Sequence, residues 1–227
     1  MICRDHQCIF VHIPKAAGQS IEQFFLRLVR LSWQTRASLL LRFNPDPKLG
    51  PRRLAHLTAS EYISCGHISE PEFNSFFKFS FVRNPWDRLV SEYEFRRRRL
   101  ECDFKAFLFE CFPAPGPSDA YRHVLPQYRF LFDENGRQLV DFIGRFEKLR
   151  ADFQVVLRKL GISEGAGDLP HRNRAHSRKT YQEYYDAEAR KFVELLYARD
   201  IELFNYRFDS DTIDHAINEE KDKTSCQ

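Results

Sequence analysis

The feature that most constrains the fold is an apolar segment that runs into a short loop of small residues and then into a helical pattern. Residues 8–13 (CIFVHI) are typical of a buried strand, and apolar side chains recur at helix spacing from Ile21 to Val29. The loop between them, residues 14–20 (PKAAGQS), should leave backbone N–H groups unpaired at a helix N-terminus, where the helix dipole favours an anion. This segment therefore predicts a strand, an anion-binding loop and a helix.

Lys15 adds a mobile positive charge to this loop, and Ser20 adds a hydroxyl group. In the Walker A loop the lysine follows the last glycine, and a Ser or Thr that holds Mg²⁺ comes next. Here Lys15 precedes Gly18 by three positions, so the loop departs from that motif. An ordinary strand-to-helix turn with an exposed lysine is the alternative interpretation.

A second strand-to-helix segment lies at residues 78–99 (KFSFVRNPWDRLVSEYEFRRRR). The apolar run ends at Val82, Pro85 suits the first turn of a helix, and Arg83 therefore falls at the carboxyl end of a strand. Ser91 follows about two helical turns later. Because open α/β sheets bind ligands at the carboxyl ends of their strands, Arg83 and Ser91 are candidates to bind a second phosphate. Two such sites imply a ligand with two separated anionic groups.

Together the two motifs resemble those of the sulfotransferases that use 3′-phosphoadenosine 5′-phosphosulfate (PAPS), in particular the carbohydrate (heparan- and chondroitin-type) branch and its small bacterial members. The resemblance implies that the 3′-phosphate of PAPS binds Arg83 and Ser91. It implies that the 5′-phosphosulfate binds the loop residues Lys15, Ala16, Ala17, Gly18, Gln19 and Ser20. Gln19 departs from the Thr or Ser that the family prefers. Similarity extends through residues 65–73, 125–131, 140–153 and 181–208.

The expected fold is α/β, a P-loop-NTPase-like single domain with a central parallel sheet flanked by helices. We expect the domain to cover residues 1–208 and a polar C-terminal tail to cover residues 209–227. A chain of 227 residues that is 43% hydrophobic is long enough and apolar enough for one such core. Strands that alternate with helices favour a parallel sheet.

Local patterns predict several further elements. Thr58 and Glu61 form a capping-box pattern that predicts a short helix at residues 58–64. Pro and Gly predict a loop at residues 112–123. Helices are predicted at residues 103–111, 147–160 and 181–205, and a strand at residues 139–144.

Charge and cysteine content argue against several classes of protein. The net charge of +3 is too small to require a nucleic-acid partner, and the chain has no apolar run long enough for a transmembrane segment. No signal peptide is evident, and the first predicted strand begins close to the start of the sequence, so we expect a cytoplasmic protein. The six cysteines form no CxxC pair and no Cys/His set with zinc-ligand spacing, so we predict reduced thiols and no metal.

Sulfuryl transfer needs a group that stabilises the leaving phosphate and a base that deprotonates the acceptor hydroxyl. Lys15 is the predicted stabilising group. His67 is the leading candidate for the base, because CGHISEPEF (65–73) resembles the base-bearing segment of uronyl 2-O-sulfotransferases. His56, which we also expect near the acceptor, is the second candidate and His12 the third. Glu70 or Glu72 would serve if His67 is structural.

Other residues are predicted to contact the ligands. The basic loop at residues 171–179 is expected to close over the nucleotide, as the resemblance implies, with Arg178 and Lys179 as cofactor-binding residues. Gln127 and Tyr128 are predicted to border the acceptor pocket, and Phe146 or Ile143 to face the adenine. The arginine run 96–99 is interpreted first as a solvated face, and the alternative is that part of it lines a path for an acidic sugar.

The predicted function is transfer of a sulfuryl group from PAPS to a hydroxyl of a carbohydrate or glycoconjugate acceptor, without a metal. A nucleotide-dependent phosphotransferase is one alternative, disfavoured because no GK[ST] sequence and no Asp placed for Mg²⁺ follow a strand. A non-catalytic module that binds polyanions or nucleic acid is the other. The sequence leaves the acceptor, the position sulfated and the oligomeric state open.

Overall fold

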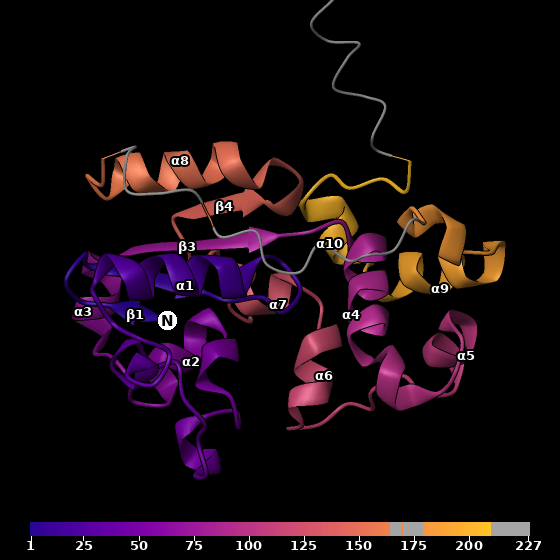
Figure 1. Cartoon of the computed structure of the whole chain (residues 1–227), viewed down its shortest axis with the longest axis horizontal. Helices are drawn as coiled ribbons and strands as arrows, with labels where there is room; N and C mark the ends of the chain where they lie inside the picture. Colours follow the sequence, from indigo (N-terminus) through magenta and orange to yellow (C-terminus); the bar gives the residue numbers. More distant parts are fainter. Residues whose placement is uncertain (164–168, 170–178, 210–227) are drawn as a thin grey trace, which may run out of the picture.

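A four-stranded sheet forms the centre of the computed structural model, which describes residues 1–163, 169 and 179–209 (Figure 1). Its strands lie in the order β1 (Ile2–Cys3), β2 (Cys8–Val11), β3 (Phe77–Val82) and β4 (Phe142–Arg145). The β2, β3 and β4 strands are parallel, as expected for this α/β class. The edge strand β1 pairs with β2 in the antiparallel sense, so the sheet is mixed rather than purely parallel.

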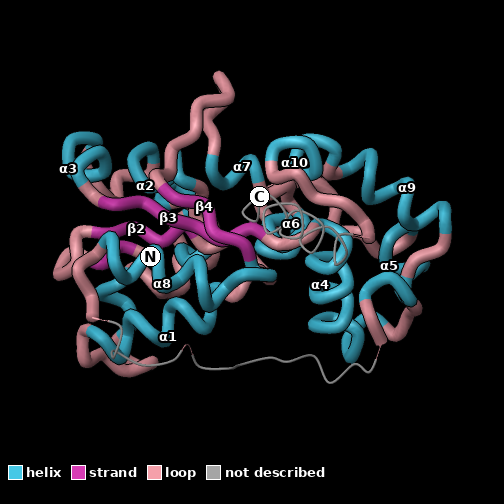
Figure 2. The backbone as a smooth tube through the Cα atoms, turned by 90° about the horizontal axis from the view of Figure 1, so that it is seen from above, coloured by secondary structure: helices cyan, strands magenta, loops and turns pink. Residues whose placement is uncertain are grey.

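Helices cover both faces of the sheet, because alternate strand side chains point to opposite sides. On one face Phe10, Phe79 and Phe81 pack with α1 (Gly18–Leu28) and α8 (Leu149–Lys159). On the other face Ile9 and Val11 belong to a second core, which includes α2 (Ala59–Ser64), α3 (Glu70–Ser75) and α7 (Tyr128–Leu131). Figure 2 shows these two layers on opposite sides of the strands.

A second group of helices lies beyond the carboxyl ends of the strands. The long helix α4 (Pro85–Leu100) follows β3 and packs against α5 (Phe104–Phe109) and α9 (Ala187–Leu196). The short helix α10 (Ala198–Leu203) contacts α7 and α9. Figures 1 and 2 both place this group beside the end of the sheet. None of the helices in the described ranges is long and apolar enough to span a bilayer.

Most predicted elements are present, and the short elements β1, α3, α6 and α7 were not predicted. The capping box of α2 is confirmed, since Glu61 N donates to Thr58 Oγ1 and Thr58 N donates to Glu61 Oε2. The predicted loop at residues 112–123 is wrong in its second half, where α6 (Asp119–Val124) begins. Ser118 caps this helix by accepting a bond from the Tyr121 amide, so the Pro- and Gly-rich stretch ends where the helix starts.

The segment between α1 and α2 carries only short 3-10 helices, namely η1 (Arg36–Leu39), η2 (Pro47–Leu49) and η3 (Leu54–His56). Two others, η4 (Phe146–Lys148) and η5 (Tyr181–Tyr184), precede α8 and α9. Both η3 and η5 supply residues to the cavity described below. The predicted tail from residue 209 and the predicted cofactor ligand Arg178 lie, apart from Asp209, outside the described residues.

Candidate active site

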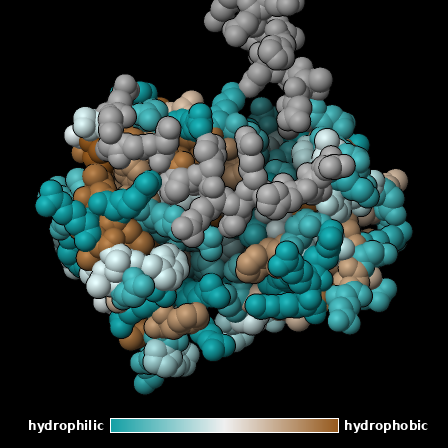
Figure 3. Space-filling model, in the orientation of Figure 1, coloured by the Kyte–Doolittle hydropathy of each residue, from teal (hydrophilic) through white to brown (hydrophobic). Residues whose placement is uncertain are grey.

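A cavity of about 590 Å³ lies at the carboxyl ends of β2 and β3, where the two predicted anion-binding segments meet. Its size is typical of a site for a small ligand. More side chains of its lining are basic than acidic. The acidic ones are Asp87 and Glu94, and the basic ones are Lys15, Arg53, Arg83, Arg150 and Lys179. This imbalance favours an anionic ligand, and Figure 3 shows a hydrophilic hollow on this face of the molecule.

The loop between β2 and α1 has the backbone of an anion cradle. Lys15 and Ala17 both adopt left-handed conformations, with φ of 70° and 66°, which L-residues rarely adopt. Ala17 is the N-cap of α1 and provides no side-chain bond to the helix, so the first N–H groups of α1 have no side-chain cap. Gly18 has no room for a Cβ, which would overlap the ring of His12.

Two arginines fix the peptide groups of this loop. Arg83 Nη1 donates to the Lys15 carbonyl at 3.0 Å, and Arg88 Nε donates to the Pro14 carbonyl at 3.0 Å. Arg88 is almost completely buried, and its other nitrogens donate to the carbonyls of His123 at 2.9 Å and Leu125 at 3.0 Å. A single buried guanidinium therefore joins the anion loop to the chain segment at the end of α6.

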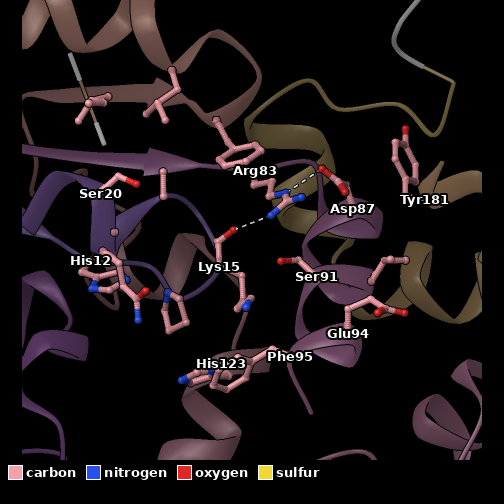
Figure 4. Close-up of a pocket in the computed structure, with 18 of the residues that line it drawn as sticks. His12, Lys15, Ser20, Arg83, Asp87, Ser91, Glu94, Phe95, His123 and Tyr181 are labelled. Atoms are coloured by element: carbon pink, nitrogen blue, oxygen red, sulfur yellow. Dashed lines mark hydrogen bonds and ion pairs between the residues drawn. The ribbon is translucent and has the colours of Figure 1, made fainter. Parts of the chain in front are cut away.

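Arg83 enters the cavity from the end of β3, as predicted, and Ser91 lines the same cavity from α4 (Figure 4). The guanidinium of Arg83 bonds Asp87 at 2.7 Å and lies 4.1 Å from the ring centre of Phe146. Ser20 also lines the cavity. The structure therefore brings the two predicted phosphate-binding motifs together around one space, with Lys15 between them.

The predicted acceptor residues Gln127 and Tyr128 do not line this cavity. Gln127 is completely buried, and its side-chain amide pairs with the backbone of Arg83: Oε1 accepts from Arg83 N at 2.9 Å, and Nε2 donates to Arg83 O at 2.8 Å. The ring of Tyr128 instead lies under the guanidinium of Arg199. Gln127 thus positions Arg83 from behind, and neither residue is placed to bind an acceptor in this cavity.

His67, the leading candidate for the base, is also outside the cavity. The chain turns at Gly66, which has φ of 73°, directly after α2. The ring of His67 then points to the segment before η3, where Nε2 lies 2.8 Å from the carbonyl oxygen of Leu49. Glu70 and Glu72 do not line the cavity either, and Glu72 pairs with Arg4. The structure therefore does not bring the preferred base to the predicted phosphate-binding residues.

Three other histidines do line the cavity, and we call them the histidine row: His12, His56 and His123. Their rings pack edge to face, with centroids 5.0 Å apart for each neighbouring pair. Each ring bonds a carboxylate through Nδ1. The pairs are His12 with Glu22 at 2.6 Å, His56 with Asp119 at 2.8 Å and His123 with Glu92 at 2.8 Å.

Burial sets the charge states in this part of the site. It lowers the pKa of His56 to about 4, so that imidazole is neutral at physiological pH. Burial raises the pKa of Asp119, but the hydrogen bond from His56 and the nearby positive groups outweigh it, so the net shift is downward. An ionised Asp119 beside a neutral His56 requires that Nδ1 carries the ring proton. His56 Nε2 therefore has the lone pair.

Lys15 is also affected by burial, which lowers its pKa to about 8. The charge of Glu92 opposes this shift, whereas Arg83 and Arg96 add to it. The ammonium Nζ lies 4.4 Å from the ring centre of Phe95, which stacks on His123 with centroids 6.0 Å apart. The Phe95 side chain is 59% exposed and lines the cavity. The Lys15 ammonium thus extends from the anion loop to Phe95, whose ring leads to the histidine row.

The remaining predicted contacts divide between two places. Lys179 and Phe146 line the cavity, as expected for nucleotide contacts, whereas Ile143 lines a separate hollow beside β4. Within the arginine run, Arg96 pairs with Glu92 and Arg97 with Glu94, and residues 97–99 are exposed.

Sequence reasoning missed several residues of the site: Asp87, Arg88, Phe95, Asp119 and His123. The spacing of Asp87 and Phe95 in the sequence could have identified these two residues. Asp87 and Phe95 lie four residues on either side of Ser91, so the predicted helix places all three on one face. Asp119 and His123 have the same spacing but fell in a segment predicted as a loop.

Two carbohydrate sulfotransferases are among the proteins that this chain resembles. It is 26% identical to carbohydrate sulfotransferase 11 of Rattus norvegicus, with 91% of this chain and 66% of the relative covered. It is 22% identical to carbohydrate sulfotransferase 10 of Danio rerio, with 90% and 65% covered. The chain therefore spans about two thirds of the length of these relatives. A crystal structure of mouse sulfotransferase SULT7A1 complexed with PAP matches 92% of this chain and 87% of that chain, with a TM-score of 0.49 and 17% identity.

The fold and the cavity define an α/β protein with paired anion-binding elements at the ends of neighbouring parallel strands. The sequence model of the sulfotransferase family matches residues 1–207, which is nearly the whole chain. The chain belongs to the sulfotransferase family.

Proposed function

We propose that this protein transfers the sulfuryl group of PAPS to a hydroxyl of a carbohydrate or glycoconjugate. The observation that carries the proposal is the meeting of three features in one cavity: the anion loop at Lys15, the Arg83–Ser91 pair, and the histidine row. The first two suit the two phosphate groups of the donor, and the third suits the proton that the acceptor must lose. The relatives named as carbohydrate sulfotransferases support the class of acceptor.

The donor binds with its 5′-phosphosulfate at the anion loop and its 3′-phosphate at Arg83 and Ser91. The N–H groups at the start of α1 and the ammonium of Lys15 then face the phosphate that becomes the leaving group. Bonds to Gln127, Asp87 and Lys15 hold Arg83 in position to bind the 3′-phosphate. Phe146 and Tyr181, which line the same cavity, are available to pack against the adenine.

We propose His56 as the general base in place of His67. It lines the cavity, its Nδ1 is bonded to Asp119, and its Nε2 lone pair is available to accept the acceptor's proton. An imidazole that is buried and oriented by a carboxylate has the tautomer and the neutral charge that a general base needs. His12 is placed less well, because its ring is packed against Gly18 beneath the anion loop.

The reaction breaks one S–O bond and forms another. The acceptor oxygen attacks sulfur as its proton moves to His56 Nε2. The bond between sulfur and the bridging oxygen breaks, and the negative charge that develops on that oxygen is stabilised by Lys15. The products are the sulfate ester and adenosine 3′,5′-bisphosphate. Phe95, which is exposed beside Lys15, provides an apolar surface against which a sugar ring can stack.

The experiment is sulfate transfer from ³⁵S-labelled PAPS to a panel of glycans and glycosides, with calorimetric binding of adenosine 3′,5′-bisphosphate measured in parallel. We expect binding of the bisphosphate at physiological salt and labelling of at least one acceptor. Binding that falls steeply with salt and shows no preference for the nucleotide would favour a polyanion-binding module instead. Phosphoryl rather than sulfuryl transfer would favour the phosphotransferase alternative.

A further inference from the structure

Asp119 and His123 lie one helical turn apart on α6, and His56 faces them from η3. One His56 nitrogen, one Asp119 oxygen and one His123 nitrogen all lie within 4.8 Å of one another. His56 Nδ1 is 2.8 Å from Asp119 Oδ1, and His123 Nε2 is 3.8 Å from Asp119 Oδ2. Tetrahedral Zn²⁺ with bonds of about 2.0–2.1 Å requires ligand atoms about 3.3 Å apart. The two distances between Asp119 and the histidines, 2.8 and 3.8 Å, lie on either side of that spacing.

Glu92 bonds His123 so that its other ring nitrogen, Nε2, faces Asp119. Glu92 is completely buried, and its Oε1 accepts a bond from Arg96 Nε. Its Oε2 lies 2.8 Å from His123 Nδ1, where it accepts the proton of that nitrogen. In the neutral ring Nε2 then has a lone pair that faces another acceptor, Asp119 Oδ2. A carboxylate behind a histidine in this way is typical of metal ligands, where it fixes the tautomer and orients the ring.

The chemistry of the group selects the kind of ion. Two imidazoles and one carboxylate suit Zn²⁺ and similar transition metals, whereas Mg²⁺ and Ca²⁺ prefer sets of oxygen ligands. Because His56 and His123 line the cavity, an ion held by them has a coordination position open toward the acceptor side. Three protein ligands and one open position are typical of zinc sites that exchange their fourth ligand.

Arg53 bonds the Asp119 carboxylate and would compete with a metal ion for it. Arg53 Nε lies 3.1 Å from Asp119 Oδ2, the oxygen that faces His123. The Arg53 side chain is 50% exposed and rests over the ring of Phe43, so it can leave Asp119 without burying a charge. Its positive charge should weaken the binding of a cation, and its removal should strengthen it.

We propose that His56, Asp119 and His123 form a site for Zn²⁺ that inhibits the enzyme from the acceptor side. A metal on Nδ1 of His56 leaves the ring proton on Nε2, and a metal on Nε2 uses its lone pair, so neither state can accept a proton from the acceptor. Inhibition should therefore be competitive with the acceptor and not with PAPS. Binding itself does not depend on the proposed function, whereas inhibition rests on it. The prediction that catalysis needs no metal is compatible with this site.

The test is titration of the full chain with ZnCl₂ by calorimetry and with CoCl₂ by visible absorption. We expect one ion per chain at this site and Co²⁺ bands of a four-coordinate complex without thiolate charge transfer. Asp119→Asn and His123→Ala should each weaken binding by at least about 100-fold, because each removes a direct ligand and loss of an outer-shell partner alone costs about 10- to 100-fold. Arg53→Gln should tighten it severalfold. His67→Ala is the matched control, because that histidine lies outside the cavity, and it should leave binding unchanged.

Unchanged affinity in both Asp119→Asn and His123→Ala would overturn the proposal, as would a thiolate charge-transfer band that places the ion on cysteine. Weaker binding in Arg53→Gln would contradict the competition for Asp119. If the protein shows no sulfotransferase activity but binds the metal with this pattern, the site stands and the proposed function fails. If it is active and Zn²⁺ binds with this pattern but does not compete with the acceptor, the inhibitory role is wrong.

Discussion

Replacing Gln127 by Met should test whether this residue positions Arg83 or contacts the acceptor. The side chain keeps its approximate volume but loses both bonds to the Arg83 backbone, at 2.9 and 2.8 Å. Each buried polar group left without a partner costs about 1–3 kcal/mol. Because Arg83 is only partly buried, water can reach its backbone in part, and we take the lower half of that range for each group. Gln127→Met should therefore lower the free energy of unfolding by about 2–4 kcal/mol.

The assay is equilibrium unfolding in urea, followed by calorimetry with adenosine 3′,5′-bisphosphate. A displaced Arg83 should also weaken bisphosphate binding by about tenfold, a cost of about 1.4 kcal/mol. Tyr128→Phe is the matched control: it removes only a hydroxyl that accepts a bond from Arg129 at 3.3 Å. It should change stability by less than about 0.5 kcal/mol. A Gln127→Met protein with normal stability and normal nucleotide affinity, but a raised KM for the acceptor, would refute the positioning role.

Three further predictions concern the site itself. Arg83→Ala should weaken binding of adenosine 3′,5′-bisphosphate by about 1.5–3 kcal/mol and leave AMP binding almost unchanged in calorimetry; equal wild-type affinities for the two nucleotides would contradict the 3′-phosphate assignment. Lys15 must be protonated to act, so kcat/KM for PAPS should fall as pH rises through about 8, and Lys15→Ala should lower kcat by about 10²-fold. An alkaline limb that persists in Lys15→Ala would assign it to another group. His56→Ala should lower kcat by about 10²- to 10⁴-fold with nucleotide affinity retained, whereas His67→Ala should keep near-normal turnover, and the reverse pattern would restore His67 as the base.

The sequence predicts those parts of the site that depend on residues close to one another along the chain. The anion loop, the strand end at Arg83 and the capping box of α2 each depend on residues within a few positions of one another. Hydrophobic periodicity and helix-terminus chemistry act over that same range. For this reason the sequence predicts the α/β class and the segments around Lys15 and Arg83 that meet at the cavity.

The side of the cavity with the histidine row depends on contacts between distant segments, which periodicity cannot report. His56 meets Asp119 across 63 positions, and Arg83 meets Gln127 across 44. His67 was preferred because of its neighbours in sequence, but the turn at Gly66 directs its ring toward Leu49. The edge strand β1 was missed because a two-residue strand is too short to show alternation.

The bonds of Arg88 mean that the two halves of the cavity cannot be altered independently. One guanidinium holds the Pro14 carbonyl at the anion loop and the His123 and Leu125 carbonyls beside the histidine row. A substitution that moves the end of α6 should therefore also move Pro14, the residue before Lys15. Engineering a new acceptor specificity into this scaffold should succeed more often through side chains such as Phe95, which does not bond to Arg88, than through insertions or deletions between residues 119 and 127.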